Sequence, residues 1–345
     1  MKVCIGFHER FIEHNLGVLH PERPRRLIEI VCLLRKELYD KLDFIEPKEA
    51  DEKDLLKVHS KDYIDLVKRL SERGGLIDLD TPVPKGTFEI AKLAVGAGIR
   101  VVSEIHKGNY KAGFALVRPP GHHAGKDFGG GFCYFNNIAI AVRYLQSRGI
   151  KKCAILDWDA HHGNGTQDIF YDDPTVLYFS THQSPLYPGT GKIDEIGINE
   201  GEGYNINFPL KAGTTGKSFE FILDEIFIPV VREFEPDFVL VSAGYDAYFR
   251  DPLTNLNFTV ETYANATRKV KELSEEICEG RLAFFLEGGY ELKGLSYSVL
   301  ATVSTLVDSP IVIEPYRVGE QKVDEYVKDR VENLKKVLMK YWSVF

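Results

Sequence analysis

The sequence predicts an α/β fold: one domain with a mostly parallel central sheet that is flanked by helices. The first observation behind this prediction is a set of short, continuous apolar runs, which are typical of strands buried on both faces, as in a parallel sheet between helices. The second is that helical stretches separate several of the runs and fit crossover connections. The runs occupy residues 114–117, 153–156, 176–179, 238–241 and 282–286.

Helical spacing of apolar residues is clear in four segments. These segments, residues 24–39, 52–72, 88–106 and 322–342, each carry apolar side chains three and four positions apart. The first begins with Pro24, which suits the first position of a helix. The amino-terminal residues carry too short an apolar stretch for a signal peptide and are expected to form a first strand.

Composition limits the classes of function. The chain has 345 residues, of which 44% are hydrophobic and 27% charged, and it lacks repeats and linker-like tracts. We therefore expect a single domain over residues 1–345. The net charge of -8 argues against direct nucleic-acid binding. No stretch approaches the ~20 apolar residues of a membrane span. Five scattered cysteines without a C-x-x-C motif suit a reducing compartment, so we expect a cytoplasmic protein.

Polar, chemistry-bearing residues follow each of the five apolar runs. The segments that follow read "RPPGHHAG", "DWDAHHGNG", "STHQ", "SAGYDA" and "EGGYE". In open parallel sheets, ligands bind just beyond the carboxyl ends of the strands. The sequence therefore predicts an active site at that edge of the sheet.

Two carboxylates and one histidine in these segments suggest a metal site. Asp159 and His161 stand two positions apart, so both side chains point to the same side of an extended segment, and Asp246 follows another run. An isolated D-x-H pair is more often a hydrogen bond that supports a turn. One imidazole and two carboxylates leave positions open for water and substrate, as in catalytic metal sites. Zn²⁺ fits such ligands, as do Fe²⁺, Co²⁺ and Mn²⁺.

The tandem histidines offer acid–base chemistry. His122 and His123 follow a "RPPG" turn and can act as a general base and its partner, although two solvated loop histidines would look the same. Asp157 and Asn164 are the available partners that would set the ring tautomers. Tyr290, after two glycines, either belongs to the core or gives a hydrogen bond to a developing oxyanion.

Two nucleotide-binding motifs are excluded, and two further features are expected to have no role in the chemistry. "GHHAGKD" lacks the spacing of a phosphate-binding loop, and "GGGFCYFN" lacks that of a dinucleotide-binding turn. Cys133 lies among aromatic neighbours, which indicates a buried structural thiol. Arg23, Arg25 and Arg26 are expected to form a solvated helix start.

The motifs as a set resemble the histone deacetylase superfamily, which also holds acetylpolyamine amidohydrolases and acetoin-utilisation proteins. The resemblance runs from "HPERPRRL" at 20–27 to "EGGYELKGL" at 287–295, through "RPPGHHA", "GGGFCYFNNIAIA", "LDWDAHHGNGTQDIF", "YPGTG" and "SAGYDA". It implies an arginase/deacetylase-like fold and a zinc-dependent hydrolase. It also implies that Asp159, His161 and Asp246 are the metal ligands, that His123 is the general base and that Tyr290 stabilises the oxyanion.

The resemblance also implies further roles for residues around this centre. Asp157 would pair with His122, and Asn164 would face His123. A structural potassium ion would be held by Asp157, Ser180 and the backbone carbonyls of Asp159, His161 and Thr181.

The same resemblance implies how substrate reaches the centre. Phe132 and Tyr187 would line a narrow tunnel with Gly131 at its wall. Asp80 would hold substrate amides at the rim, and Arg23 would lie near the acetate exit. Leu253 stands where some polyamine-selective relatives carry Glu.

The predicted function is therefore metal-dependent hydrolysis of the amide in acetyl-lysine of proteins or peptides. An acetylated polyamine is the alternative substrate, and a catalytically weak acyl-lysine-binding protein is the alternative of another class. Binuclear ureohydrolases share the architecture, but they need more metal-binding carboxylates than this set supplies. The sequence leaves open whether the chain forms oligomers.

Overall fold

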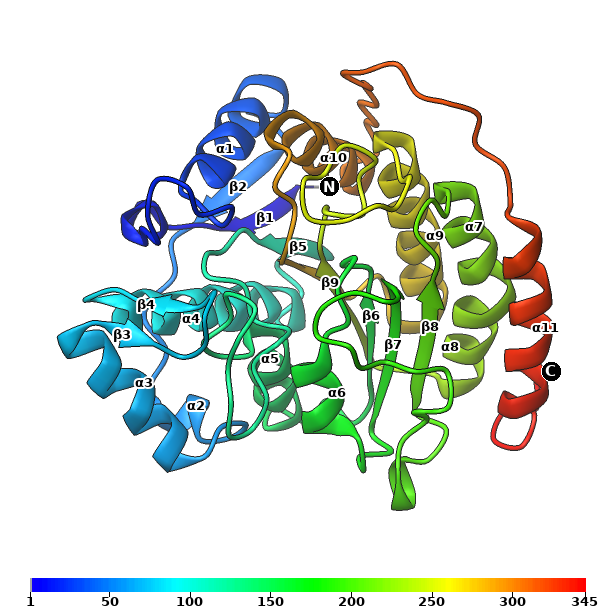
Figure 1. Cartoon of the computed structure of the whole chain (residues 1–345), viewed down its shortest axis with the longest axis horizontal. Helices are drawn as coiled ribbons and strands as arrows, with labels where there is room; N and C mark the ends of the chain where they lie inside the picture. Colours follow the sequence, from blue (N-terminus) through cyan, green and yellow to red (C-terminus); the bar gives the residue numbers. More distant parts are fainter. Residues whose placement is uncertain (1) are drawn as a thin grey trace.

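An eight-stranded parallel sheet forms the centre of the molecule in the computed structural model, which describes residues 2–345 (Figure 1). Its strand order is β2-β1-β5-β10-β9-β6-β7-β8, and a separate two-stranded antiparallel hairpin consists of β3 and β4. The strands are β1 Val3–Gly6, β2 Leu42–Ile45, β3 Gly75–Leu76, β4 Pro82–Val83, β5 Ala112–Ala115, β6 Cys153–Asp157, β7 Val176–Gln183, β8 Asn205–Leu210, β9 Phe238–Ala243 and β10 Leu282–Leu286.

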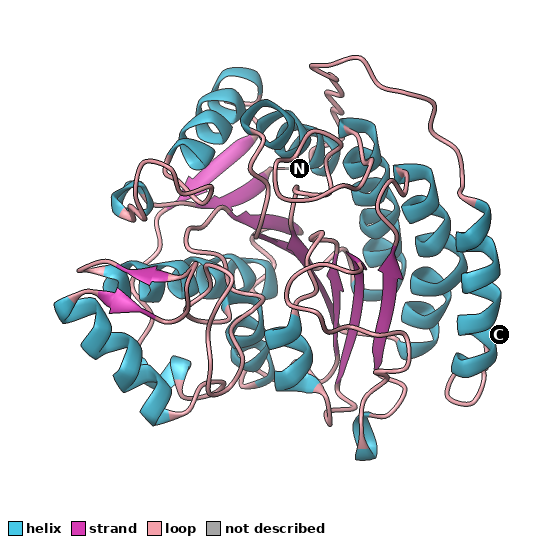
Figure 2. Cartoon of the chain, viewed as in Figure 1, coloured by secondary structure: helices cyan, strands magenta, loops and turns pink. Residues whose placement is uncertain are grey.

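Helices cover both faces of the sheet, as Figure 2 shows in cyan around the magenta strands. One layer contains α4 and α5, with α2, α3 and α6 beside them, and the other contains α1, α10, α9, α7, α8 and α11. The helices are α1 Arg25–Glu37, α2 Glu52–Leu55, α3 Lys61–Arg73, α4 Thr87–His106, α5 Asn137–Gln146, α6 Asn164–Phe170, α7 Gly216–Ile222, α8 Ile228–Phe234, α9 Val260–Cys278, α10 Leu292–Leu306 and α11 Glu325–Leu338. Single turns of other helix types lie at Glu9–Glu13, Asn199–Gly201 and Leu223–Phe227.

The core lies where the two helical layers meet the sheet. The inner strands are buried along their whole length, which is why they read as continuous apolar runs. Phe114 of β5 and Phe284 of β10 are register partners, and their rings stack with centroids 5.7 Å apart. The predicted fold class, a single α/β domain with a parallel sheet between helices, is confirmed.

Several predicted boundaries differ from the structure. The predicted helix over 52–72 is two helices, because Ser60 accepts a hydrogen bond from the Tyr63 amide and so caps a new start at α3. Strand β5 begins two residues before the run that predicted it. Strands β2 and β8 had no apolar run to mark them, because both lie at the edges of the sheet and carry polar residues.

The parallel arrangement gathers the polar segments at one edge. Strands β5, β10, β9, β6 and β7 are neighbours in the sheet and run in the same direction, so their carboxyl ends share that edge. Within residues 2–345, no helix is long and apolar enough to cross a membrane.

Candidate active site

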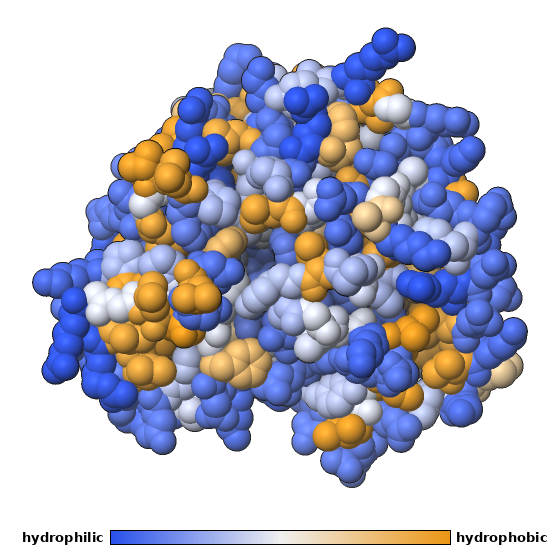
Figure 3. Space-filling view, in the orientation of Figure 1, coloured by the Kyte–Doolittle hydropathy of each residue, from blue (hydrophilic) through white to orange (hydrophobic). Residues whose placement is uncertain are grey.

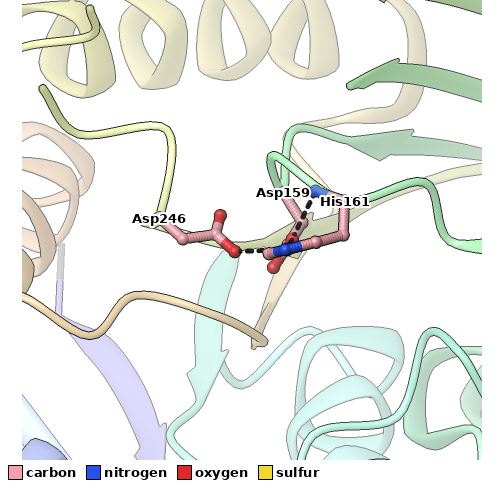
Figure 4. Close-up of side chains that lie close together, drawn as sticks. All are labelled: Asp159, His161 and Asp246. Carbon is pink, nitrogen blue, oxygen red and sulfur yellow. Dashed lines mark hydrogen bonds and ion pairs between the residues drawn. The ribbon is translucent and has the colours of Figure 1, made fainter. Parts of the chain in front are cut away.

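Asp159, His161 and Asp246 converge beyond the ends of β6 and β9 (Figure 4). One ligand atom from each lies within 4.8 Å of the others, and no second group of three such side chains gathers in this way among the described residues. His161 Nδ1 lies 2.8 Å from Asp246 Oδ2 and 3.2 Å from Asp159 Oδ1. The D-x-H pair therefore faces a third carboxylate from another strand end, an arrangement that an isolated turn does not need.

Backbone amides and glycines hold the two carboxylates in place. The Gly288 amide donates to Asp159 Oδ2 at 2.7 Å, and the Ala160 amide donates to Asp246 Oδ1 at 2.8 Å. A Cβ atom at Gly288 would lie 2.4 Å from Asp246 Oδ2, and one at Gly244 would lie 2.1 Å from Asp159 Oδ2. Only glycine leaves room for both carboxylates at these two positions.

The electrostatics of this trio fit a cation. Burial and the neighbouring Asp159 charge raise the pKa of Asp246 to about 6. Burial acts against ionisation of Asp159 as well, but the charges of His122 and His161 outweigh it and lower its pKa. Two buried carboxylates at such close range repel each other, and a divalent ion between them would relieve this repulsion. The donor set of one imidazole and two carboxylates therefore fits the metal that the sequence implied.

The tandem histidines lie side by side with ring centroids 4.0 Å apart, and each has its own partner. His122 Nδ1 lies 3.1 Å from Asp157 Oδ2, and His123 Nδ1 lies 2.8 Å from Asn164 Oδ1. An amide oxygen can only accept, so His123 Nδ1 carries the hydrogen and Nε2 keeps its lone pair.

These partners make the two rings electrically different. Burial lowers the pKa of His122, but the charges of Asp157 and Asp159 outweigh it and raise the pKa above its ordinary value. Burial, reinforced by the charges of His122 and His161, holds the pKa of His123 well below its ordinary value. These surroundings favour the charged form of His122 and the neutral form of His123.

A second cluster of buried charge, which the sequence did not reveal, lies behind Tyr290. Glu22 accepts from Arg118 Nη2 at 2.7 Å and from Arg26 Nη1 at 3.1 Å, and all three side chains are fully buried. Arg26 Nε donates to the Gly289 carbonyl at 2.6 Å, and its guanidinium lies 5.0 Å from the centroid of the Tyr290 ring.

This cluster corrects one prediction about the arginines. The prediction of a solvated helix start holds for Arg25, which is exposed and paired with Glu29. The same prediction is wrong for Arg26, which is buried. Arg26 shares the inner face of α1 with Leu27 and other apolar residues, so it enters the core with them. Arg26 also contacts the "EGGY" loop, through the Gly289 and Glu287 carbonyls.

A cavity of about 770 Å³ opens above these groups. Figure 3 shows this face hollowed near its centre, with hydrophobic groups around the hollow. Ten of the predicted site residues line the cavity: Asp80, His122, His123, Gly131, Phe132, Asp159, His161, Tyr187, Leu253 and Tyr290.

The remaining predicted residues are not part of the cavity lining. Asp246, Asp157 and Asn164 lie behind it and contact the residues that do line it. Ser180 is the register partner of Asp157 in the β6–β7 ladder, and Thr181 is the next residue; both are buried.

Comparison with known proteins decides the family. The histone deacetylase domain matches residues 20–306 of the chain. The chain belongs to the histone deacetylase family. A probable deacetylase from Archaeoglobus fulgidus is 42% identical over the full length of both chains. Histone deacetylase 14 of Arabidopsis thaliana, described as chloroplastic, is 40% identical over 92% of this chain and 81% of its own. The crystal structure of the HDA15 HD domain superposes with a TM-score of 0.92, at 35% identity, over 100% of this chain and 98% of that one.

Family membership confirms the resemblance seen in the motifs and implies a deacetylase, a hydrolase of acetylated substrates. Histone deacetylases are generally metal-dependent, and the Asp159, His161 and Asp246 trio is a candidate site for such a metal. Because plant relatives are described as chloroplastic, location varies within the histone deacetylase family, and the cytoplasmic assignment stays a prediction.

Sequence reasoning also missed a buried acid next to the tandem histidines. Glu287 Oε2 accepts from the Gly121 amide at 2.7 Å and the His122 amide at 3.2 Å, while its Oε1 has no partner within the described residues. Burial raises the pKa of Glu287 to about 7. The signal was present, because Glu287 opens the quoted "EGGY" motif, but nothing in its spacing showed that it reaches back to another strand end.

Proposed function

We propose that this chain is a metal-dependent amidohydrolase that removes the acetyl group from the side-chain amine of acetyl-lysine in proteins or peptides. The observation that carries the proposal is that three groups meet at one cavity: the trio of Asp159, His161 and Asp246, the His123 ring and the Tyr290 hydroxyl. This combination provides a binding site for a cation, a base and an oxyanion donor around one reacting carbonyl.

Asp159, His161 and Asp246 would hold the ion. Zn²⁺ suits the set, and Fe²⁺, Co²⁺ and Mn²⁺ accept the same donors. A divalent ion in this position polarises an acyl carbonyl and makes a nearby water more acidic. His161 projects toward both carboxylates from the segment after β6, so the trio needs no loop movement to assemble.

His123 acts as the base in this proposal. Its Nε2 is the acceptor, because Asn164 fixes the hydrogen on Nδ1, and it takes a proton from the attacking water. The water oxygen bonds to the acetyl carbon, the amide C–N bond breaks, and a histidine of the pair supplies the proton for the departing amine. The products are acetate and a free lysine amine.

Tyr290 stabilises the oxyanion that forms during the attack. Its side chain lines the cavity from the loop after β10, and the Arg26 guanidinium packs over its ring from behind. The hydroxyl hydrogen bond would be strongest when charge develops on the carbonyl oxygen.

A potassium ion would have a structural role beneath the centre. Asp157 and Ser180 face each other across neighbouring strands, and both are fully buried, which supports a site formed with the carbonyls of Asp159, His161 and Thr181. There it would support the loop that carries two of the proposed metal ligands.

Acetyl-lysine is favoured over an acetylated polyamine by the cavity mouth. Leu253 lines the cavity where a polyamine site would need an acid to meet a second ammonium. Phe132 and Tyr187 line the path inward, and the Tyr187 ring lies edge-on to His123, with centroids 5.1 Å apart. Asp80 remains available at the mouth to accept from backbone amides of a peptide.

The test is turnover by metal-loaded protein of an acetyl-lysine peptide and of an acetylated polyamine, with Asp246→Ala as the inactive control. The proposal expects release of acetate from the peptide and none with the variant. A strong preference for the polyamine would replace the proposed substrate class. Tight binding of the acetylated peptide by metal-loaded protein without any product would instead identify an acyl-lysine-binding protein.

A further inference from the structure

Three almost fully exposed aliphatic side chains lie at the mouth of the cavity. Val18, Leu19 and Leu79 are 91%, 97% and 98% exposed, and all three line the cavity; we call them the mouth patch. Figure 3 shows hydrophobic groups beside the central hollow, among them groups over the β3–β4 hairpin that flanks the Leu79 loop. Single exposed leucines are ordinary, but a group of them at the mouth of a cavity is typical of a binding surface.

The two loops that carry the mouth patch are fixed to each other and to the tunnel. His20 Nε2 lies 3.2 Å from the Asp80 carbonyl oxygen, and the His20 ring lies edge-on to Phe132 with centroids 4.7 Å apart. The Phe132 amide in turn donates to Thr81 Oγ1 at 3.0 Å. These contacts hold the backbone of both loops, so the aliphatic side chains face solvent from a prearranged wall.

We propose that the mouth patch binds an apolar side chain that neighbours the acylated lysine in a polypeptide substrate. This inference rests on the proposed function, because it assigns a substrate class to the same site. When the acyl-lysine occupies the tunnel past Phe132 and Tyr187, the adjoining residues of the polypeptide must lie against the mouth. An apolar neighbour would there cover Leu19 and Leu79, which otherwise stay in water.

The charges around the mouth agree with this occupant. Among the described residues that line the cavity there is no lysine or arginine, and the carboxylate of Asp80 lies at the mouth beside that of Asp78. An acidic neighbour of the acyl-lysine would meet Asp80 without a compensating cation. Leu253 adds a further apolar group on the cavity wall, so the lining favours uncharged, apolar neighbours.

A second copy of the chain fits the mouth patch less well. A stable protein–protein interface covers about 800 Å² on each partner, and three aliphatic side chains offer much less than that. The patch is also continuous with the tunnel through His20 and Phe132, as expected for a subsite of the substrate.

The experiment compares two acetyl-lysine peptides that differ only in the residues on either side of the lysine, leucine in one and serine in the other. We expect kcat/KM for the leucine peptide to exceed that for the serine peptide by about tenfold, which corresponds to about 1.4 kcal/mol. The double variant Leu19→Ser/Leu79→Ser should bring this ratio close to one. The control Val312→Ser, at a 44% exposed aliphatic residue outside the cavity lining, should keep the native ratio. A ratio near one in the native protein overturns the inference.

Binding of the same two peptides, labelled and followed by fluorescence anisotropy, separates this inference from the proposed function. A leucine preference in binding that the double variant removes supports the mouth patch even if neither peptide is hydrolysed, in which case only the proposed function fails. Hydrolysis of both peptides at equal rates supports the function and overturns the mouth patch. Equal binding, together with a change of oligomeric state in the double variant by light scattering, assigns the patch to self-association instead.

Discussion

Two clusters of buried charge lie near Tyr290, and their charges are compensated in different ways. The first contains Glu22 between Arg26 and Arg118, so the chain supplies both signs of charge. The second contains Asp159 and Asp246 around His161, with one ligand atom of each within 4.8 Å of the others, so two buried carboxylates repel each other there. The first can support the structure with its own charges, whereas the second has the donor set of the cation site that we propose.

The difference explains what each cluster contributes. The arginine cluster makes hydrogen bonds in several directions, to Phe11 and His14 carbonyls through Arg118 and to the Gly289 carbonyl through Arg26. It therefore fixes the segments around Tyr290. The carboxylate cluster leaves its atoms directed at one point, which is the property a metal centre requires. Four experiments test this comparison, in decreasing order of expected effect.

Removing one carboxylate of the metal cluster should have the largest effect. Asp246→Asn removes a proposed metal ligand. It should therefore lower kcat/KM by more than about 100-fold, the largest loss expected for a residue that only hydrogen-bonds to a ligand. A chelator should lower the melting temperature of the native protein, since a metal present at 100 times its Kd stabilises by about 2.7 kcal/mol, and it should not lower that of the variant. Asp224→Asn, at an exposed carboxylate paired with Lys269, is the control. A variant that still responds to the chelator would mean that the metal binds elsewhere.

Removing one arginine of the Glu22 cluster should lower the stability of the fold and not only the activity. Arg118→Met leaves Glu22 buried with one fewer partner and should lower the free energy of unfolding by about 3–5 kcal/mol. The matched control is Arg232→Met, which removes an exposed pair with Glu276 and should cost at most about 1 kcal/mol. Denaturant unfolding measures both. Equal losses of unfolding free energy in the two variants would show that the buried Glu22 cluster stabilises the protein no more than an exposed ion pair does.

Replacing Tyr290 tests whether the tyrosine that packs against the arginine cluster takes part in the reaction at the carboxylate cluster. Tyr290→Phe should lower kcat by about 100-fold while the stabilising effect of metal on melting temperature stays the same, because in the proposed reaction the hydroxyl acts only on the developing oxyanion. Tyr341→Phe removes an exposed hydroxyl that donates to Glu202 and should leave turnover unchanged. An increase in KM with kcat unchanged would assign Tyr290 to substrate binding.

His14, whose carbonyl accepts a hydrogen bond from Arg118 of the arginine cluster, should make the stability of the protein depend on pH. It is buried, both of its ring nitrogens lack partners within residues 2–345, and burial lowers its pKa to about 4. As the pH falls, His14 binds a proton in the unfolded chain before it does so in the folded chain. The free energy of unfolding is therefore at its full value above about pH 6.5 and falls as the pH drops toward 4, by up to about 3 kcal/mol. In His14→Phe the melting temperature should fall less between pH 6.5 and 4 than in the native protein. Parallel curves for the two proteins would exclude His14 as the source.

The sequence by itself determined the fold class and several of the polar residues at the candidate active site. Continuous apolar runs revealed the inner strands, because a strand buried on both faces has no polar positions to interrupt it. Asp159 and His161 were recognisable because they are two positions apart, and His122 and His123 because they are adjacent. Edge strands β2 and β8 were not predicted, because each has a neighbouring strand on one side only and carries polar residues that interrupt an apolar run.

Only the tertiary structure decided which distant side chains share an environment. Glu22, Arg118 and Glu287 come from three separate segments, and no spacing along the chain shows that the first two are paired or that the third holds the Gly121 amide. Arg26 looks like any charged residue at a helix start until its face of α1 is seen to pack on α10. Local patterns reveal groups that one turn or one strand brings together, whereas burial and charge balance depend on contacts between segments that only folding creates.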